Sequence, residues 1–223
     1  MNENLWGMQI TLEQLLIGFS DTLYMVFFSL LFSAVIGLPL GILLVITRKG
    51  HILENQWVFN LLNPIINILR SIPFIILLVA IIPITRFIVG SAIGTNAAIV
   101  PLVFYAGPYI ARLVENSLLE VDKGIIEAAQ AMGATNWQII SRFLLPEGLS
   151  SLILTFTTAT IGLVGASAMA GAVGAGGVGD LALTYGYQRF DTMTMIVTVA
   201  VLVIIVQLLQ SSGNILARKI RRR

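Results

Sequence analysis

The chain has 223 residues, of which 57% are hydrophobic and 11% charged, with a formal net charge of +2. A soluble domain carries about 25% charged residues, so this composition leaves too little polar surface for a globule in water and predicts an integral membrane protein. The single histidine and the lack of cysteine exclude disulfides, thiolate metal sites and histidine clusters. The small net charge also gives no general attraction to nucleic acid.

Five apolar stretches are long enough to cross a bilayer, which takes about 20 residues of helix. They cover residues 19–46, 57–89, 97–114, 149–173 and 192–209. A secretory signal peptide begins with basic residues. Because no lysine or arginine precedes Arg48, we expect no secretory signal here. The predicted fold class is therefore all-α integral membrane, with five transmembrane helices.

The basic residues predict the orientation, because Lys and Arg gather in cytoplasmic loops. If the spans alternate, most of them fall on one side: Arg48, Lys49, Arg112, Lys123, Arg142, Arg218, Lys219, Arg221, Arg222 and Arg223. The opposite side holds Arg86 and Arg189. We expect an external N-terminal segment (1–18), a transmembrane domain (19–213) and a basic cytoplasmic tail (214–223).

The second span is irregular, since Pro64, Pro73 and Pro83 each remove a backbone donor from it. We expect an amphipathic segment at 57–69 on the cytoplasmic side that turns into the span near Pro73. Arg70, which comes just before that turn, needs a partner or an interface. Alternatively, its side chain snorkels to the headgroups.

Two glycines four residues apart, Gly37 and Gly41, form the small-xxx-small pattern in the first span. This pattern favours close approach of another helix. Internal repeats are not evident, which counts against an inverted-repeat secondary transporter.

The loop at 114–148 is the most polar part of the chain. Asp122 is a plausible N-cap and Gly133 a plausible stop for a short helix, and a second helix is expected at 136–144, ending before Pro146. The first helix carries one predicted apolar stripe, made by Ile125, Ala128, Ala129 and Met132. Such a pair of helices lies on lipid, packs on its own spans or docks into a groove of another protein; periodicity leaves all of these open.

A motif in this loop resembles the EAA loop of ABC importer permeases. Glu127-Ala128-Ala129 is followed by Gly133 and then by Leu145-Pro146, all at the spacing of that motif. Phe143 stands where the family usually has isoleucine, an apolar-for-apolar departure. Several fixed spacings make this match specific, whereas a lone Glu-Ala-Ala would carry no information.

The resemblance extends over most of the chain and is to the permease of methionine importers. The matching segments are Arg70-Ser71-Ile72-Pro73-Phe74, Val114-Glu115-Asn116, Glu127 to Ala134, and Gly171 to Gly177. It implies a type I ABC importer permease fold in the cytoplasmic (inner) membrane. It also implies a homodimer that works with two ATPase subunits and an external substrate-binding protein, importing L- or D-methionine.

The family's EAA loop forms a coupling helix that sits in a cleft of the ATPase. The resemblance thus implies a coupling role for Glu127, Ala128, Ala129, Gly133, Ala134, Leu145 and Pro146. No cofactor is expected in this chain, because ATP and magnesium belong to the partner. The chain itself is expected to be a transporter subunit and not an enzyme.

Four residues are candidates for the gate or the pathway: Met169, Arg70, Ser71 and Pro73. A methionine near the constriction is implied by the resemblance, while the alternative for Met169 is a gap-filling methionine that faces a helix or lipid. Tyr185, Tyr187, Arg189 and Asp191 either meet the external binding protein or form an interfacial belt.

The segment 174–179 matches G-x-G-x-x-G, but a dinucleotide site needs a strand before it and a helix after it. We expect a tightly turned glycine-rich loop instead. Three other functions stay open: an importer of another small solute, an ion-coupled carrier and a membrane enzyme. The carrier predicts ionisable residues at span centres, and the enzyme predicts a catalytic cluster; neither is evident.

Overall fold

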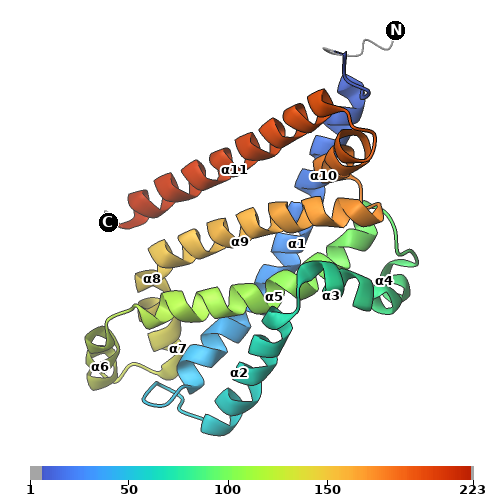
Figure 1. Cartoon of the computed structure of the whole chain (residues 1–223). Helices are drawn as coiled ribbons and strands as arrows, with labels where there is room; N and C mark the ends of the chain where they lie inside the picture. The colour runs from blue at the N-terminus through green and yellow to red at the C-terminus, as the bar shows by residue number, and fades with distance from the viewer. Residues whose placement is uncertain (1–6, 222–223) are drawn as a thin grey trace. The chain divides into compact units, whose positions relative to one another are not determined.

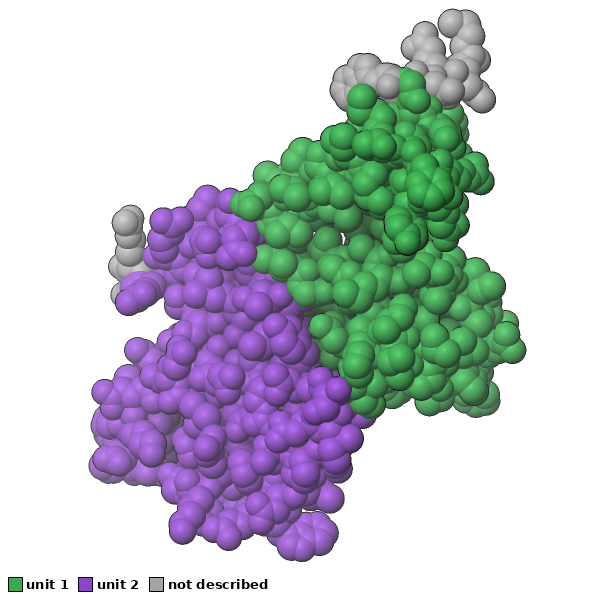
Figure 2. Space-filling view, viewed as in Figure 1, with its two compact units in different colours: residues 1–32, 72–106, 160–209 green, residues 33–71, 107–159, 210–223 purple. Residues whose placement is uncertain are grey.

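A computed structural model describes residues 7–221, and in that range helices are joined by turns and short loops, with no β-strand (Figure 1). The chain divides into two compact units, coloured separately in Figure 2. Unit 1 comprises residues 7–32, 72–106 and 160–209 of the described chain, and unit 2 comprises residues 33–71, 107–159 and 210–221. Helices α1, α5, α9 and α11 contribute residues to both units.

The long helices are α1 (Leu12–Thr47), α2 (Gln56–Ser71), α5 (Thr95–Leu119), α9 (Leu149–Ala170) and α11 (Thr192–Arg221). The shorter α-helices are α3 (Phe74–Ala80), α4 (Ile82–Val89), α6 (Lys123–Ala131), α7 (Asn136–Gln138), α8 (Leu145–Glu147) and α10 (Gly177–Leu181). Between them lie two π-helical stretches, η2 (Ile139–Leu144) and η4 (Ala182–Tyr187), and the 3-10 turn η3 (Gly171–Val173).

Four helical stretches in the described chain are long and apolar enough to cross a membrane: α1, α5, Leu149–Val173 and α11. The broken pair α2 and α3 brings the number to five if it forms one span. Two boundaries differ from the predicted ones. Helix α1 already begins at Leu12, and α11 continues through most of the predicted tail to Arg221, while Arg222 and Arg223 lie outside the described residues.

The second predicted span is divided into α2, α3 and α4. Pro73 occupies the N-cap of α3, and Pro83 lies in the first turn of α4, where a missing N–H removes no intrahelical bond. Pro64 is accommodated inside α2. The predicted amphipathic segment before Pro73 is confirmed: α2 buries Ile66 on one face and exposes Trp57 on another.

The core of unit 2 forms where α1 packs on α5. A Cβ built on Gly37 would lie 2.7 Å from the Gly107 carbonyl oxygen, and one built on Gly41 would lie 2.6 Å from that of Ala111. These distances leave no room for a side chain, so the small-xxx-small pattern is confirmed as a helix contact. Leu44, Ile66 and Ala111 complete a buried apolar cluster that joins α1, α2 and α5.

In unit 1, the glycine-rich segment brings α10 against α1 and α9. The Val178 amide donates to the Thr22 hydroxyl at 2.9 Å, and a Cβ on Gly179 would lie 2.3 Å from the Ala168 Cα. Gly174, Gly176 and Gly177 have positive φ angles. The segment is thus a tight packing turn between helices, and the described chain offers no strand for a dinucleotide fingerprint.

Candidate coupling and pathway sites

Helix α6 carries the first part of the predicted coupling motif. The Asp122 carboxylate accepts a hydrogen bond from the Gly124 amide at 2.7 Å, so this residue is the N-cap that the sequence indicates. Ala129 is fully buried, whereas Glu127 and Ala128 are exposed. The motif therefore presents its glutamate and one alanine on the surface and packs the other alanine inside unit 2.

The predicted apolar stripe of α6 is only partly right. Ile125 is half-buried and Ala129 buried, but Ala128 is exposed and Met132 is 71% exposed. The reason is that α6 ends at Ala131, so Met132 is the C-cap and lies at the end of the packed surface. Ile126, which is half-buried, faces inward in its place.

A closed turn links α6 to α7 at Gly133. Its φ angle is +79°, its amide donates to the Gln130 carbonyl at 2.9 Å, and the Ala134 amide donates to the Ala129 carbonyl at 3.1 Å. This pair of bonds is a Schellman motif, which requires a left-handed residue at the glycine position. The predicted helix stop at Gly133 is confirmed, with a defined geometry.

The start of α7 is equally well defined. Thr135 and Gln138 form a capping box, in which the Thr135 amide donates to the Gln138 side chain at 2.9 Å and the Thr135 hydroxyl accepts from the Gln138 amide. Trp137 is 73% exposed beside this box. Large apolar side chains at Met132 and Trp137 therefore flank a rigid turn on the surface of unit 2.

The helix after the turn does not end before Pro146 as predicted. It continues through η2 into α8, and Pro146 sits in the first turn of α8, where its missing amide is tolerated. Ile139, Ile140 and Leu144 of η2 are buried and α6 packs on η2. Leu145 and Pro146 thus belong to the helical element that supports α6.

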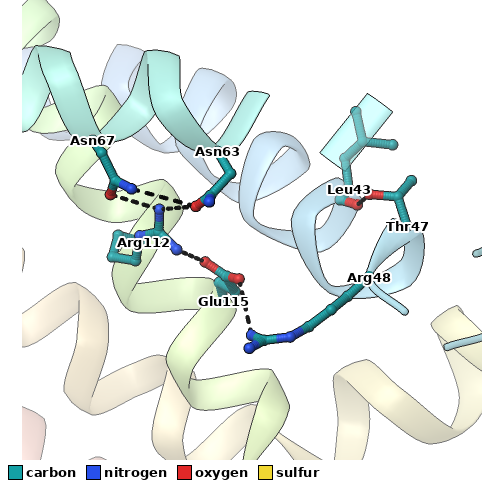
Figure 3. Close-up of polar contacts among 7 residues, drawn as sticks. All are labelled: Leu43, Thr47, Arg48, Asn63, Asn67, Arg112 and Glu115. Atoms are coloured by element: carbon teal, nitrogen blue, oxygen red, sulfur yellow. Dashed lines mark hydrogen bonds and ion pairs between the residues drawn. The ribbon is translucent and has the colours of Figure 1, made fainter. Parts of the chain in front are cut away.

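A buried polar cluster lies in unit 2 (Figure 3). Glu115, only 1% exposed, contacts Arg112 on its own helix and Arg48, whose Nη1 is 3.4 Å from the Glu115 Oε1. Arg112 also donates to the side-chain oxygens of Asn63 at 2.6 Å and Asn67 at 2.7 Å. The sequence analysis named Glu115 only through the family resemblance. The local signal for an ion pair here is an arginine and a glutamate three residues apart near the end of a predicted span.

A cavity of about 240 Å³ separates α6 from the loop after α1. Its lining includes His51 and Ile52 from the loop, and Lys123, Glu127 and Gln130 from α6. Burial lowers the pKa of His51 below its usual range, and the nearby charges of Lys123 and Arg48 lower it further. The loop and α6 are thus close enough for the charge of Lys123 to act on His51.

The pathway candidates occupy both units. Arg70 and Ser71 are exposed at the end of α2 in unit 2, where the Ser71 hydroxyl donates to the Asn67 carbonyl at 2.8 Å. Pro73 and Met169 belong to unit 1. Met169 is 54% exposed on α9, and Gly165, one turn earlier, has open space around it. The four pathway candidates are thus divided between the two units and do not form one cluster within either of them.

Residues 37–223 match the family of binding-protein-dependent transport system inner membrane components. The chain belongs to this family. It is therefore a multi-pass permease subunit of the inner membrane, and this family assignment decides against the ion-coupled carrier.

Relatives of this permease share nearly its whole length. It is 51% identical over 206 residues to the probable D-methionine transport system permease protein MetI of Pasteurella multocida, covering 92% of this chain and 95% of that one. The Haemophilus influenzae protein of the same name is 46% identical over 219 residues, covering 98% and 100%. A solved inward-facing structure of the MetNI methionine ABC transporter has a chain that superposes with a TM-score of 0.92 at 50% identity, covering 94% of this permease and 97% of that chain.

Proposed function

We propose that this permease imports methionine, as the membrane-spanning part of an ATP-driven ABC importer. The observation that carries the proposal is similarity along nearly the full chain to methionine permeases, both in sequence and in fold. The substrate includes D-methionine, following the names of these relatives. Two copies of the chain form the pathway, because one five-span chain cannot surround a solute from two sides.

ATP hydrolysis is supplied by two separate ATPase subunits that dock on the α6–α7 turn. Support comes from the surface itself, where exposed Glu127, Ala128, Met132 and Trp137 surround a turn held by a Schellman motif and a capping box. Exposed apolar side chains on a rigid element suit insertion into a cleft of a partner. ATP and magnesium are bound by that partner, and a substrate-binding protein delivers the solute.

Gating follows from closure of the two ATPase subunits around ATP. Closure displaces the coupling helices, and the spans move between inward-open and outward-open arrangements as rigid bodies. Met169 lines the constriction of the path, and Arg70, Ser71 and Pro73 are the further residues of the gate or pathway. The exposure of Met169 beside the open Gly165 supports this placement.

The experiment is purification of the tagged permease from its native membrane in mild detergent, with mass spectrometry of the proteins that accompany it. We expect a stoichiometric ATPase whose hydrolysis in proteoliposomes, with the binding protein added, responds to methionine. Isolation of the permease alone in several mild detergents would contradict the importer assignment. An ATPase that responds to another small solute and not to methionine would support the alternative substrate.

A further inference from the structure

Glu115 is a buried charge in the part of unit 2 where α1, α2 and α5 pack together. Its side chain is 1% exposed, next to the apolar cluster of Leu44, Ile66 and Ala111. Burial of a carboxylate is unfavourable unless cations and hydrogen bonds compensate, and apolar residues of similar volume often stabilise a fold as well. A charge buried here is compensated only while its partners stay within reach, so it ties together the segments that supply them.

The two arginines that contact Glu115 hold it very differently. Arg112 is 16% exposed and fixed on both sides, by Glu115 and by the two asparagines of α2. Arg48 is 46% exposed, its contact with Glu115 is 3.4 Å long, and its guanidinium also lies over the Phe59 ring of α2, 5.8 Å from the ring centroid. A long contact that is open to water on the arginine side is weaker than the enclosed pair with Arg112. The cluster therefore has a firm link to α2 and a loose link to the end of α1 (Figure 3).

The loose link leads toward the coupling helix. Arg48 follows directly after α1 and begins the loop at 48–55. Gly50, His51 and Ile52 of that loop line the same cavity as Lys123 and Glu127 of α6. Leu118, Val121 and Leu144 also line the cavity, so a displacement of α6 into it closes on the loop as well as on α5 and η2. Arg48 connects the loop to Glu115.

We infer that the Arg48–Glu115 contact is a releasable link that carries the movement of the coupling helix to α2 and α5. Arg48 and Glu115 are positioning residues: they touch neither substrate nor ATP, and they keep the loop at 48–55 in register with the α2–α5 pair. This inference rests on the proposed function, because it assigns the movement of α6 to a docked ATPase.

The test uses the complete transporter, with ATPase and binding protein, in proteoliposomes. The quantity measured is methionine transported per ATP hydrolysed, together with the melting temperature of the complex. For Arg48→Gln we expect this ratio to fall about fivefold or more, the lower end of typical coupling factors, with an unchanged melting temperature. Arg48→Lys keeps the charge and should restore the ratio. Lys49→Gln removes the same charge one residue away, outside the cluster, and should behave as wild type.

Glu115→Gln provides the second arm of the test. If Arg48 acts through Glu115, the double variant Arg48→Gln/Glu115→Gln has the same ratio as Glu115→Gln alone, since contacting residues are not additive. The link would be overturned if the double variant lost the sum of the two single losses in transport per ATP, or if Arg48→Gln left this ratio unchanged. It would also be overturned if Arg48→Gln lowered transport, hydrolysis and the melting temperature together. A wild-type complex that does not transport methionine counts against the proposed function, whereas normal wild-type transport with an unchanged ratio in Arg48→Gln counts against the link alone.

Discussion

Gly133 combines a conformational requirement with an exposed position, which makes it a sharp probe of coupling. A Cβ on this residue would meet nothing within 4 Å, so the constraint is its φ angle of +79° and not space. A β-branched residue in this conformation costs about 1–2 kcal/mol, whereas asparagine visits it readily. We expect Gly133→Val to uncouple ATP hydrolysis from transport while the spans stay inserted.

The matched variant is Gly133→Asn, which should keep both the turn and most of the coupling. Both variants are measured by substrate-stimulated ATPase activity and by transport in the same preparation. Glu127→Lys, which reverses a charge on the same surface, should resemble the valine variant. Normal stimulation in Gly133→Val and Glu127→Lys together would show that this turn does not dock the ATPase.

Met169 is the residue whose proposed role depends on its exposure. Its side chain is 54% exposed, and Gly165 beside it is uncovered. If Met169 closes the path, Met169→Gly should raise solute leakage through the transporter without ATP. Met169→Leu conserves the volume of the side chain and should leave leakage low. Equal leakage in both variants and the wild type would assign Met169 to a contact with lipid or another helix.

At the scale of elements, the contact between α1 and α5 in unit 2 has no spare volume at Gly41. A Cβ there would lie 2.6 Å from both the Ala111 carbonyl oxygen and the Val114 Cβ. Overpacking of this kind costs about 1–3 kcal/mol, so Gly41→Ala should lower the melting temperature in detergent. Gly107→Ala is the control from the same contact, because its Cβ would meet only Ile36 at 3.8 Å; its melting temperature should not fall.

The start of α11 depends on Asp191. Hydrogen bonds hold the pKa of this carboxyl below its usual range, first from the Thr194 hydroxyl and then from the Gln9 amide at 2.7 Å. The Oδ1 atom of Asp191 also accepts hydrogen bonds from the Met193 and Thr194 amides. Asp191 is therefore the N-cap of α11. Because the pKa of Asp191 is lower in the folded protein, its carboxylate stabilises the fold fully at pH values above the usual pKa of 3.8. This stabilisation is lost as the pH falls through the lowered pKa of the folded protein.

Asp191→Asn should therefore melt at a lower temperature than the wild type at neutral pH. The difference should persist down to the ordinary pKa of 3.8 and shrink below it, as the wild-type carboxyl becomes protonated. Thermal unfolding in detergent over this pH range measures the difference. A gap of constant size across the whole range would mean that the charge of Asp191 does not hold the cap.

At the scale of the whole molecule, we propose that the N-terminus is external and the C-terminus cytoplasmic, following the distribution of basic residues. The chain contains no cysteine, so single substitutions report accessibility directly. Lys49→Cys should react with a membrane-impermeant maleimide only in inverted vesicles, and Ser91→Cys only in intact cells with the outer membrane permeabilised. Both residues are exposed. The reverse pattern would invert the topology and place the EAA turn outside, away from any ATPase.

The sequence by itself determined the elements whose causes are local or compositional. Apolar length indicated the membrane helices, Asp122 and Gly133 marked the bounds of α6, and Pro73 marked the break before α3. Gly37 and Gly41 correctly indicated a helix contact. Each of these rests on the chemistry of one residue or one short run, which hardly depends on what packs nearby.

Only the tertiary structure decided which side chains meet. Sequence periodicity placed Met132 in a buried stripe, but the helix ends just before it, and the side chain is exposed because nothing covers the C-cap. The second helix of the loop was expected to end before Pro146, yet η2 runs into α8 without a break and Pro146 lies in the first turn of α8. The cluster around Glu115 joins residues from three segments far apart in the chain. The energy of a buried charge depends on the partners that the fold brings to it, so no local pattern in the sequence could identify them.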